Sequence, residues 1–119
     1  MNKSLIVTLI IILSVFISIS CSKDNDGGGT TTVDCSTVTN KAFSADVNPI
    51  IQGTCGSSGC HGTGSTNGPG ALTNYAQISG SASSIRSAVS SGRMPKNSSL
   101  SSGQKNSIIC WIDNGALNN

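Results

Sequence analysis

Two cysteines and a histidine lie close together near the middle of this 119-residue chain. Cys55 and Cys60 are separated by Gly56-Ser57-Ser58-Gly59, and His61 follows the second cysteine directly. A histidine directly after the second of two neighbouring cysteines is typical of covalent haem attachment, usually with two residues between the cysteines. The two thiols add to the haem vinyl groups, and the adjacent imidazole can then bind the iron. Because glycine stands at both ends of the four-residue spacer, the spacer can loop out without strain.

The chain has five cysteines, so a second interpretation stays open. Leaving Cys21 aside, Cys35, Cys55, Cys60 and Cys110 could form two disulfides in any of three pairings. The two disulfides would then stabilise a surface binding module without haem. From Lys41 onward, Leu, Ile, Val and Phe make up only about a sixth of the residues, which is low for a self-supporting core. Both interpretations supply the cross-link or cofactor that such a small core needs.

Residues 1–20 have the layout of a secretory signal peptide. Lys3 gives the start a positive charge, and the apolar run from Leu5 to Ile17 is too short to span a bilayer comfortably. Cys21 comes directly after this stretch, an arrangement that resembles the lipobox of bacterial lipoproteins, in which the cysteine is lipidated. Ser22-Lys23-Asp24-Asn25-Asp26 is similar to the acidic signals of some outer-membrane lipoproteins. These resemblances imply an anchor in the outer membrane through an N-terminal lipid, with the protein facing the periplasm or the cell surface.

Composition divides the rest of the chain into a tether and one domain. Residues 21–40, the lipidated cysteine and the stretch after it, are rich in Gly, Thr, Ser, Asp and Asn and predict a flexible tether. Residues 41–119 are enough for a single small domain. The net charge is only +2, and no basic patch with interleaved aromatic residues occurs, so nucleic acid is not an expected partner. The domain carries no nucleophile–base pair and no carboxylate dyad, so we do not expect an enzyme.

The apolar pattern of the domain favours short helices, and no strand-like alternation of any length occurs. Helix signals occur over 44–53, beginning at Ser44 or at Asn48; around Ile85 and Val89, before Gly92; and from Ser101, which forms a capping box with Gln104, to Gly115. We therefore expect an all-α fold of three to four short helices around one prosthetic group.

The segment from Phe43 to Asn119 resembles the small cytochrome c domains of bacterial lipoproteins and secreted proteins, a variety of class I cytochrome c. Four stretches carry the resemblance: 43–51 resembles the helix before the haem cysteines, Gly68-Pro69-Gly70-Ala71-Leu72 the turn beside the proximal histidine, Ser91-Gly92-Arg93-Met94-Pro95 the loop of the distal methionine, and 100–116 the C-terminal helix. Some multihaem cytochromes have the same four-residue cysteine spacer.

The resemblance implies a cofactor, a ligand set and a function. One haem c would be bound covalently by Cys55 and Cys60, with His61 and Met94 as the two axial iron ligands. The carbonyl of Pro69 would accept a hydrogen bond from His61 Nδ1. The protein would then be a monomer that exchanges single electrons with redox protein partners, its iron cycling between Fe(II) and Fe(III). If Met94 does not bind the iron, the alternative is a haem sensor with an open sixth position.

Cys35 and Cys110 are extra to the pattern of this family. With Cys21, Cys55 and Cys60 assigned by the two resemblances, a disulfide between the remaining two cysteines is expected. It would tie the end of the tether to the last helix and close a loop of about 75 residues.

Overall fold

The computed structural model describes residues 32–119, so the expected signal peptide, the lipid site at Cys21 and most of the tether lie outside the described residues. Within 32–119 the elements in chain order are η1 (Phe43–Val47, a π-helical turn), α2 (Asn48–Thr54), α3 (Tyr75–Gly80), α4 (Ala82–Ser90) and α5 (Ser102–Asp113). This range contains no strand, so the predicted all-α class of three to four short helices is confirmed, and besides the turn η1 the α-helices number four. No helix of this range is long and apolar enough to cross a membrane.

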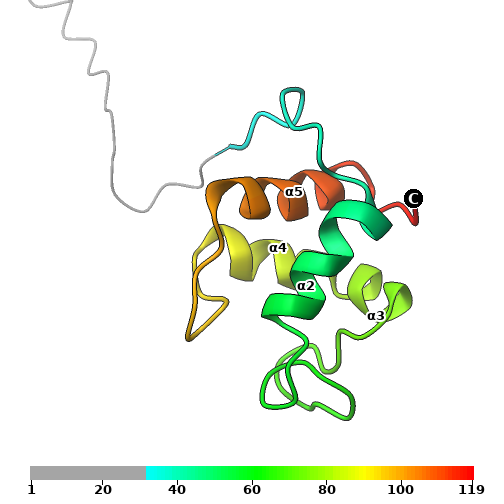
Figure 1. Ribbon diagram of the computed structural model, residues 1–119, viewed down its shortest axis with the longest axis vertical. Helices are drawn as coiled ribbons and strands as arrows, with labels where there is room; N and C mark the ends of the chain where they lie inside the picture. The colour runs from blue at the N-terminus through cyan, green and yellow to red at the C-terminus, as the bar shows by residue number, and fades with distance from the viewer. Residues whose placement is uncertain (1–31) are drawn as a thin grey trace, which may run out of the picture.

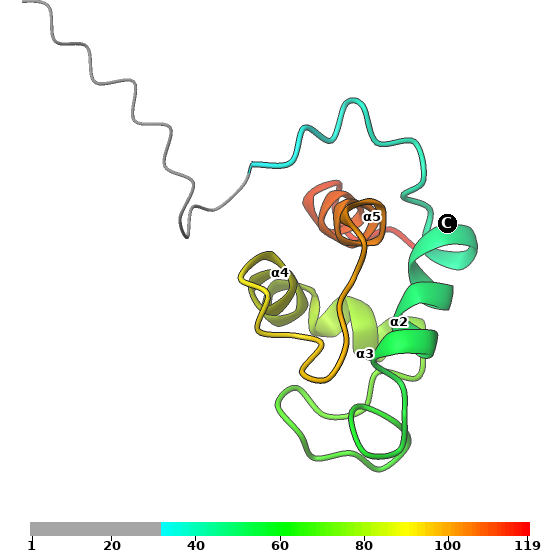
Figure 2. The same cartoon turned by 60° about the vertical axis from the view of Figure 1, so that its left-hand side comes forward.

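The helices surround a small core that lies beneath α5 (Figures 1 and 2). Both α4 and η1 pack against α5, and α2 continues directly from η1. The fully buried side chains are Val47, Ile51, Ile78, Ile108, Ile109, Cys110 and Trp111. Each large apolar side chain in this set contributes on the order of 1.5–3 kcal/mol by leaving water. The core therefore occupies one end of the molecule, and long loops form the other end.

The first helical run starts differently from either predicted start. Neither Ser44 nor Asn48 caps it: the backbone N–H of Ala42 donates to Asp46 Oδ2 at 2.9 Å, which also places a carboxylate at the positive end of the helix. The N–H of Ser44 donates instead to the carbonyl of Asn119 at 2.8 Å. The π-helical turn of η1 then leads into α2, where Pro49 lies at a helix start that does not need its missing N–H.

The last helix begins where the sequence predicted. Gln104 N donates to Ser101 Oγ at 3.2 Å and Ser101 N donates to Gln104 Oε1 at 2.9 Å, so the capping box is confirmed. Two glycines with positive φ also stand at the predicted helix ends, Gly92 after α4 and Gly115 after α5. Gly92 matters for the site because the loop that carries Met94 begins there.

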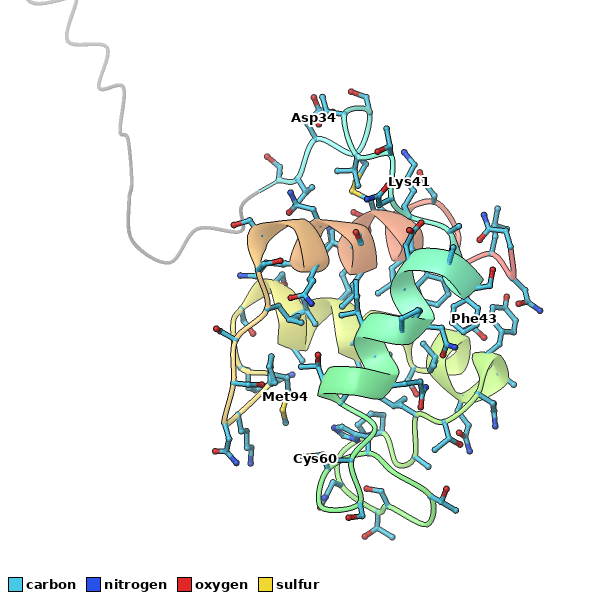
Figure 3. The ribbon with its side chains drawn as sticks, viewed as in Figure 1. Asp34, Lys41, Phe43, Cys60 and Met94 are labelled. Carbon is cyan, nitrogen blue, oxygen red and sulfur yellow. A yellow bond between two sulfur atoms is a disulfide. The ribbon has the colours of Figure 1, made fainter. Side chains whose placement is uncertain are left out.

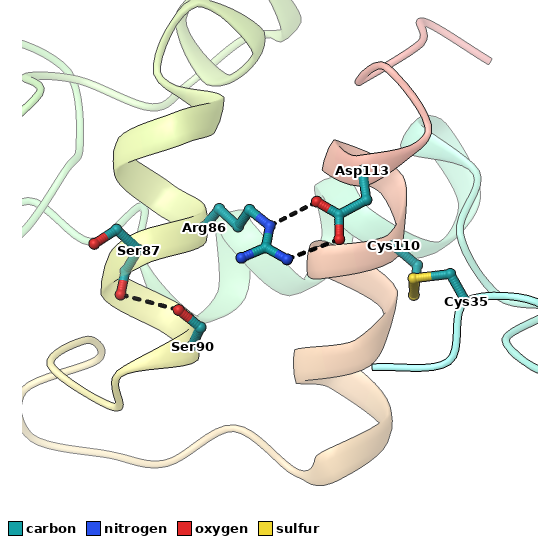
Figure 4. Close-up of polar contacts among 6 residues, drawn as sticks. All are labelled: Cys35, Arg86, Ser87, Ser90, Cys110 and Asp113. Atoms are coloured by element: carbon teal, nitrogen blue, oxygen red, sulfur yellow. Dashed lines mark hydrogen bonds and ion pairs between the residues drawn. A yellow bond between two sulfur atoms is a disulfide. The ribbon is translucent and has the colours of Figure 1, made fainter. Parts of the chain in front are cut away.

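A disulfide joins Cys35 to Cys110, as expected, across a sequence separation of 75. Figure 4 shows this bond linking the segment before η1 to α5. Lys41 Nζ donates to the Cys35 carbonyl at 2.7 Å, and Val33 packs partly against the core. The chain from Val33 to Lys41, which we call the strap, is thus joined to α5 by the disulfide.

An ion pair between α4 and α5 makes stability depend on pH (Figure 4). Arg86 donates from Nε to Asp113 Oδ1 at 2.6 Å and from Nη2 to Oδ2 at 2.9 Å. These hydrogen bonds hold the pKa of Asp113 below its ordinary value. A carboxyl group whose pKa is lower in the folded state stabilises the fold above its unfolded pKa, and this stabilisation is lost as pH falls through the folded pKa. Both side chains are 35% exposed, so solvent limits the contribution to about 1 kcal/mol or less.

We therefore expect Asp113→Asn to lower the free energy of unfolding by up to about 1 kcal/mol at pH 7, because the amide cannot pair with Arg86 as a charge. At a pH below the folded pKa of Asp113, where the wild-type carboxyl is protonated as well, the two proteins should differ little. Urea unfolding at both pH values measures the difference. An equal loss of stability at both would show that the substitution acts through packing rather than through the ion pair.

Candidate functional site

A cavity of about 780 Å³ lies at the end of the molecule away from the strap. This volume lies within the range of roughly 300–1,000 Å³ that is usual for cofactor and small-molecule sites. Its wall comes from the end of α2, the loop before α3, one face of α4 and the loop after α4. Figure 3 labels Cys60 and Met94, which lie at this end, and Lys41, which lies at the other. The lining residues used below are Cys55, Cys60, His61, Pro69, Leu72, Ile85, Ala88, Val89, Arg93, Met94 and Lys96.

The four residues between the two cysteines fold back in a compact turn. Cys60 N and Gly62 N both donate to the Ser57 carbonyl at 2.9 Å, and His61 N donates to the Cys55 carbonyl at 2.9 Å. A Cβ atom at Gly62 would lie only 2.9 Å from Ser57 O, so only glycine fits there. The turn brings Cys55, Cys60 and His61 to one wall of the cavity.

Neither Cys55 nor Cys60 takes part in a disulfide. Cys55 is partly buried and Cys60 is exposed. Burial raises the pKa of the Cys55 thiol, and the nearby Cys60 raises it further. Two reduced thiols thus stand on one wall with different surroundings, where they can form thioethers with a ligand that enters the cavity or a disulfide with each other.

The imidazole of His61 is buried, with 8% of its surface exposed, and its orientation is set by one hydrogen bond. Nδ1 lies 2.9 Å from the carbonyl oxygen of Gly70, so Nδ1 acts as the donor. The backbone carbonyl of His61 also accepts from Leu72 N at 2.8 Å. In this tautomer Nε2 carries the free lone pair, and it has no hydrogen-bond partner within residues 32–119. His61 lines the cavity, so this nitrogen is available to a metal there.

The acceptor for His61 is Gly70 and not Pro69, the residue expected from the family resemblance. Gly70 N donates to the Asn67 carbonyl at 3.0 Å and so closes a four-residue turn. Gly68 and Gly70 both have positive φ, at 53° and 90°. This left-handed backbone, which glycine enters readily, directs the carbonyl one residue later in the turn toward the imidazole. Pro69 itself lines the cavity.

Met94 reaches the same cavity from the loop after α4. Its backbone N–H donates to the Ala88 carbonyl at 3.1 Å, which folds the start of the loop back onto the helix. The side chain is partly buried and lines the cavity together with Pro95. The structure thus collects two thiols, one imidazole nitrogen and one thioether sulfur from separate parts of the chain around a single space.

Sequence reasoning missed the side chains that stabilise this loop. Asn67 Nδ2 donates to the Cys60 carbonyl at 3.0 Å and to the Gly59 carbonyl at 3.3 Å, and Ser65 Oγ donates to the same Cys60 carbonyl. These bonds connect the cysteine loop to the turn that holds Gly70. No sequence signal identified them, because the spacing of a polar loop does not show where the chain folds back.

The apolar part of the lining is formed by Leu72 with Ile85, Ala88 and Val89 of α4, all four of which are buried. The i, i+4 spacing of Ile85 and Val89 predicted a helix but not a ligand wall. Residues 32–119 contain no cluster of three or more His, Cys, Asp or Glu side chains that could hold a bare metal ion. The donors present would fit a cofactor that brings its own metal: the two thiols could bind it covalently, and His61 and Met94 could each supply one ligand to the metal.

The fold and the site together define a small all-α, disulfide-linked domain with a cavity lined by thiols, an imidazole and a thioether. Comparisons with protein-family models, with curated proteins and with solved structures returned no match for this chain.

Proposed function

We propose that this chain is an electron-transfer protein with one covalently bound haem c. The observation that carries the proposal is the convergence of Cys55, Cys60, His61 and Met94 on one cavity, two of them as free thiols and one as an imidazole with its Nε2 unpaired. When bound, the haem would supply a one-electron Fe(III)/Fe(II) couple. The residues present fit this group in donor type and in the volume of the cavity.

Each protein group has a distinct task in this proposal. The thiols of Cys55 and Cys60 would hold the haem through thioether bonds formed by addition to its vinyl groups, and His61 would offer Nε2 as an iron ligand. The hydrogen bond from His61 Nδ1 to Gly70 fixes the ring orientation and makes Nε2 a stronger donor. The thioether of Met94 favours the reduced state relative to a second imidazole. The apolar side chains of α4 would limit the access of water to the bound group.

The location, the oligomeric state and the partners of the protein belong to the same proposal. The protein would be held at the outer membrane by a lipid on Cys21, which lies outside the described residues. It would work as a monomer that passes electrons between redox proteins and catalyses no reaction of its own. The strap would join the tether to α5 through the Cys35–Cys110 disulfide.

A pyridine haemochrome spectrum after acid–acetone extraction tests the proposal. The full chain should be exported by a host that assembles c-type cytochromes. We expect haem to stay with the protein at about one per chain, because acid–acetone removes only non-covalent haem. A colourless protein with Cys55 and Cys60 joined in a disulfide would contradict the proposal and favour the haem-free binding module.

We expect Met94→Ala to open the sixth iron position, because no other methionine lies within residues 32–119 and His61 is the only histidine of the chain. The variant should keep its haem, as the wild type does, but should become high-spin in the ferric state and bind CO rapidly once reduced, and the wild type should do neither of these. Its reduction potential should fall, since the thioether favours Fe(II). Absorbance spectra with and without CO measure the spin state and the CO binding. Met94→His should restore a low-spin state. A wild type that already binds CO rapidly would favour the haem sensor.

A further inference from the structure

Two cations stand at the mouth of the cavity. Arg93 and Lys96 both line the cavity and are both exposed, on either side of Met94 and Pro95. The other lining residues that are exposed, which include Ser57, Asn67, Asn97 and Ser98, carry no charge. The rim is thus formed by small, uncharged groups with two fixed positive charges beside the Met94 loop.

No carboxylate within the described residues balances these two charges. The sequence from 47 to 112 contains no Asp or Glu. Asp34 lies in the strap, Asp46 bonds to the start of η1, and Asp113 is paired with Arg86, which is the one salt bridge of residues 32–119. Figure 3 shows Asp34 and Lys41 at the end of the molecule opposite Cys60 and Met94. The positive charges of Arg93 and Lys96 are thus unpaired where the cavity opens, whereas Lys41 lies with Asp34 at the other end of the molecule.

We infer that the rim of the cavity, with Arg93 and Lys96, is the face where a redox partner docks, and that this partner presents an acidic protein surface. The inference rests on the proposed function and adds the charge of the partner to it. A positive rim around the site of electron exchange attracts a negative surface during encounter and orients it. The small neutral residues between the two cations let that surface come close.

Stopped-flow oxidation of the reduced holoprotein by two small probes tests this inference. Hexacyanoferrate(III) is a trianion, and tris(phenanthroline)cobalt(III) is a trication. We expect the anionic probe to react more slowly as ionic strength rises from about 0.01 to about 0.1 M, because the screening length falls from about 30 to about 10 Å. The cationic probe should react faster over the same range.

Arg93→Gln and Lys96→Gln should each lower the rate with hexacyanoferrate at low salt, and together by about tenfold, the lower limit for electrostatic steering. Arg93→Lys should keep the wild-type rate. The matched control is Lys41→Gln, which removes the same charge at the far end of the molecule and should leave the rate unchanged.

The outcomes separate this inference from the proposed function. A protein without haem overturns both. A haem protein in which all three glutamine variants slow the reaction equally overturns only the docking face, because net charge would then explain the effect. Arg93→Gln and Lys96→Gln could instead change the reduction potential or the haem content without changing the salt dependence of the rate. The two cations would then interact with the carboxylates of the haem rather than with a partner, and the docking face would again be overturned.

Discussion

Replacement of Cys55 and Cys60 together by alanine is expected to abolish the proposed covalent binding of haem completely. Both thiols are free in the structure and line the same cavity as His61, and no other free thiol lies within residues 32–119. Without them nothing in the described chain can form a thioether to the ring. The mass of the intact chain should fall by that of one haem in addition to the two sulfur atoms, and acid–acetone should leave the protein colourless. Mass spectrometry and the pyridine haemochrome spectrum measure both changes.

The chain offers a matched control for this experiment. The double substitution Cys35→Ala/Cys110→Ala also removes two sulfur atoms, but from the strap and α5 instead of from the cavity. It should leave the haem attached. If both double variants lose haem equally, the loss reflects poor export or folding, and the assignment of Cys55 and Cys60 loses its support. If neither loses it, the thiols do not hold the cofactor.

The same Cys35→Ala/Cys110→Ala variant is expected to have the largest effect on stability. The disulfide closes a loop across 75 residues, and the chain-entropy account gives such a cross-link a stabilisation of up to about 4 kcal/mol. This is a large share of the stability of a small domain, which typically totals about 5–15 kcal/mol. Loss of the bond also frees the strap from α5, since the Lys41 bond to Cys35 joins two residues of the strap itself and Val33 packs only partly against the core.

Urea or thermal unfolding of the wild type and of the variant measures this loss. Lys41→Ala is a useful comparison, because it removes the hydrogen bond to the Cys35 carbonyl while the disulfide stays in place. It should cost no more than about 1.5 kcal/mol, the net value of an ordinary hydrogen bond. If the disulfide variant and Lys41→Ala have the same unfolding midpoint, the cross-link does not contribute to stability, and the core and any bound cofactor stabilise the fold without it.

Features that depend on neighbours in the sequence could be predicted. The capping box of Ser101 and Gln104 needs only two residues three positions apart, and it forms as predicted. The helical spacing of Ile85 and Val89 places both on the buried face of α4. The pairing of Cys35 with Cys110 was expected once the resemblances had assigned the other three cysteines, and it is present.

Features that depend on where the chain folds back could not be predicted from the sequence. The shift of the His61 partner from Pro69 to Gly70 results from two glycines with positive φ, which a motif does not specify to one residue. Ser44 and Asn48 are both sound capping residues, yet Asp46 closes the first turn of the run while Asn119 takes the Ser44 N–H. Local capping energies of about 1 kcal/mol are easily outweighed by contacts between distant segments.

The sequence by itself determined the chemistry on offer: which thiols, which imidazole and which thioether exist, and which short segments become helices. Those properties belong to side-chain type and to spacing over a few residues. Only the tertiary structure decided that Cys60 and Met94, far apart in the chain, line one cavity, and that no carboxylate of the described residues lines it. Such placement follows from the packing of α4 and η1 against α5, and packing depends on the whole set of buried side chains at once.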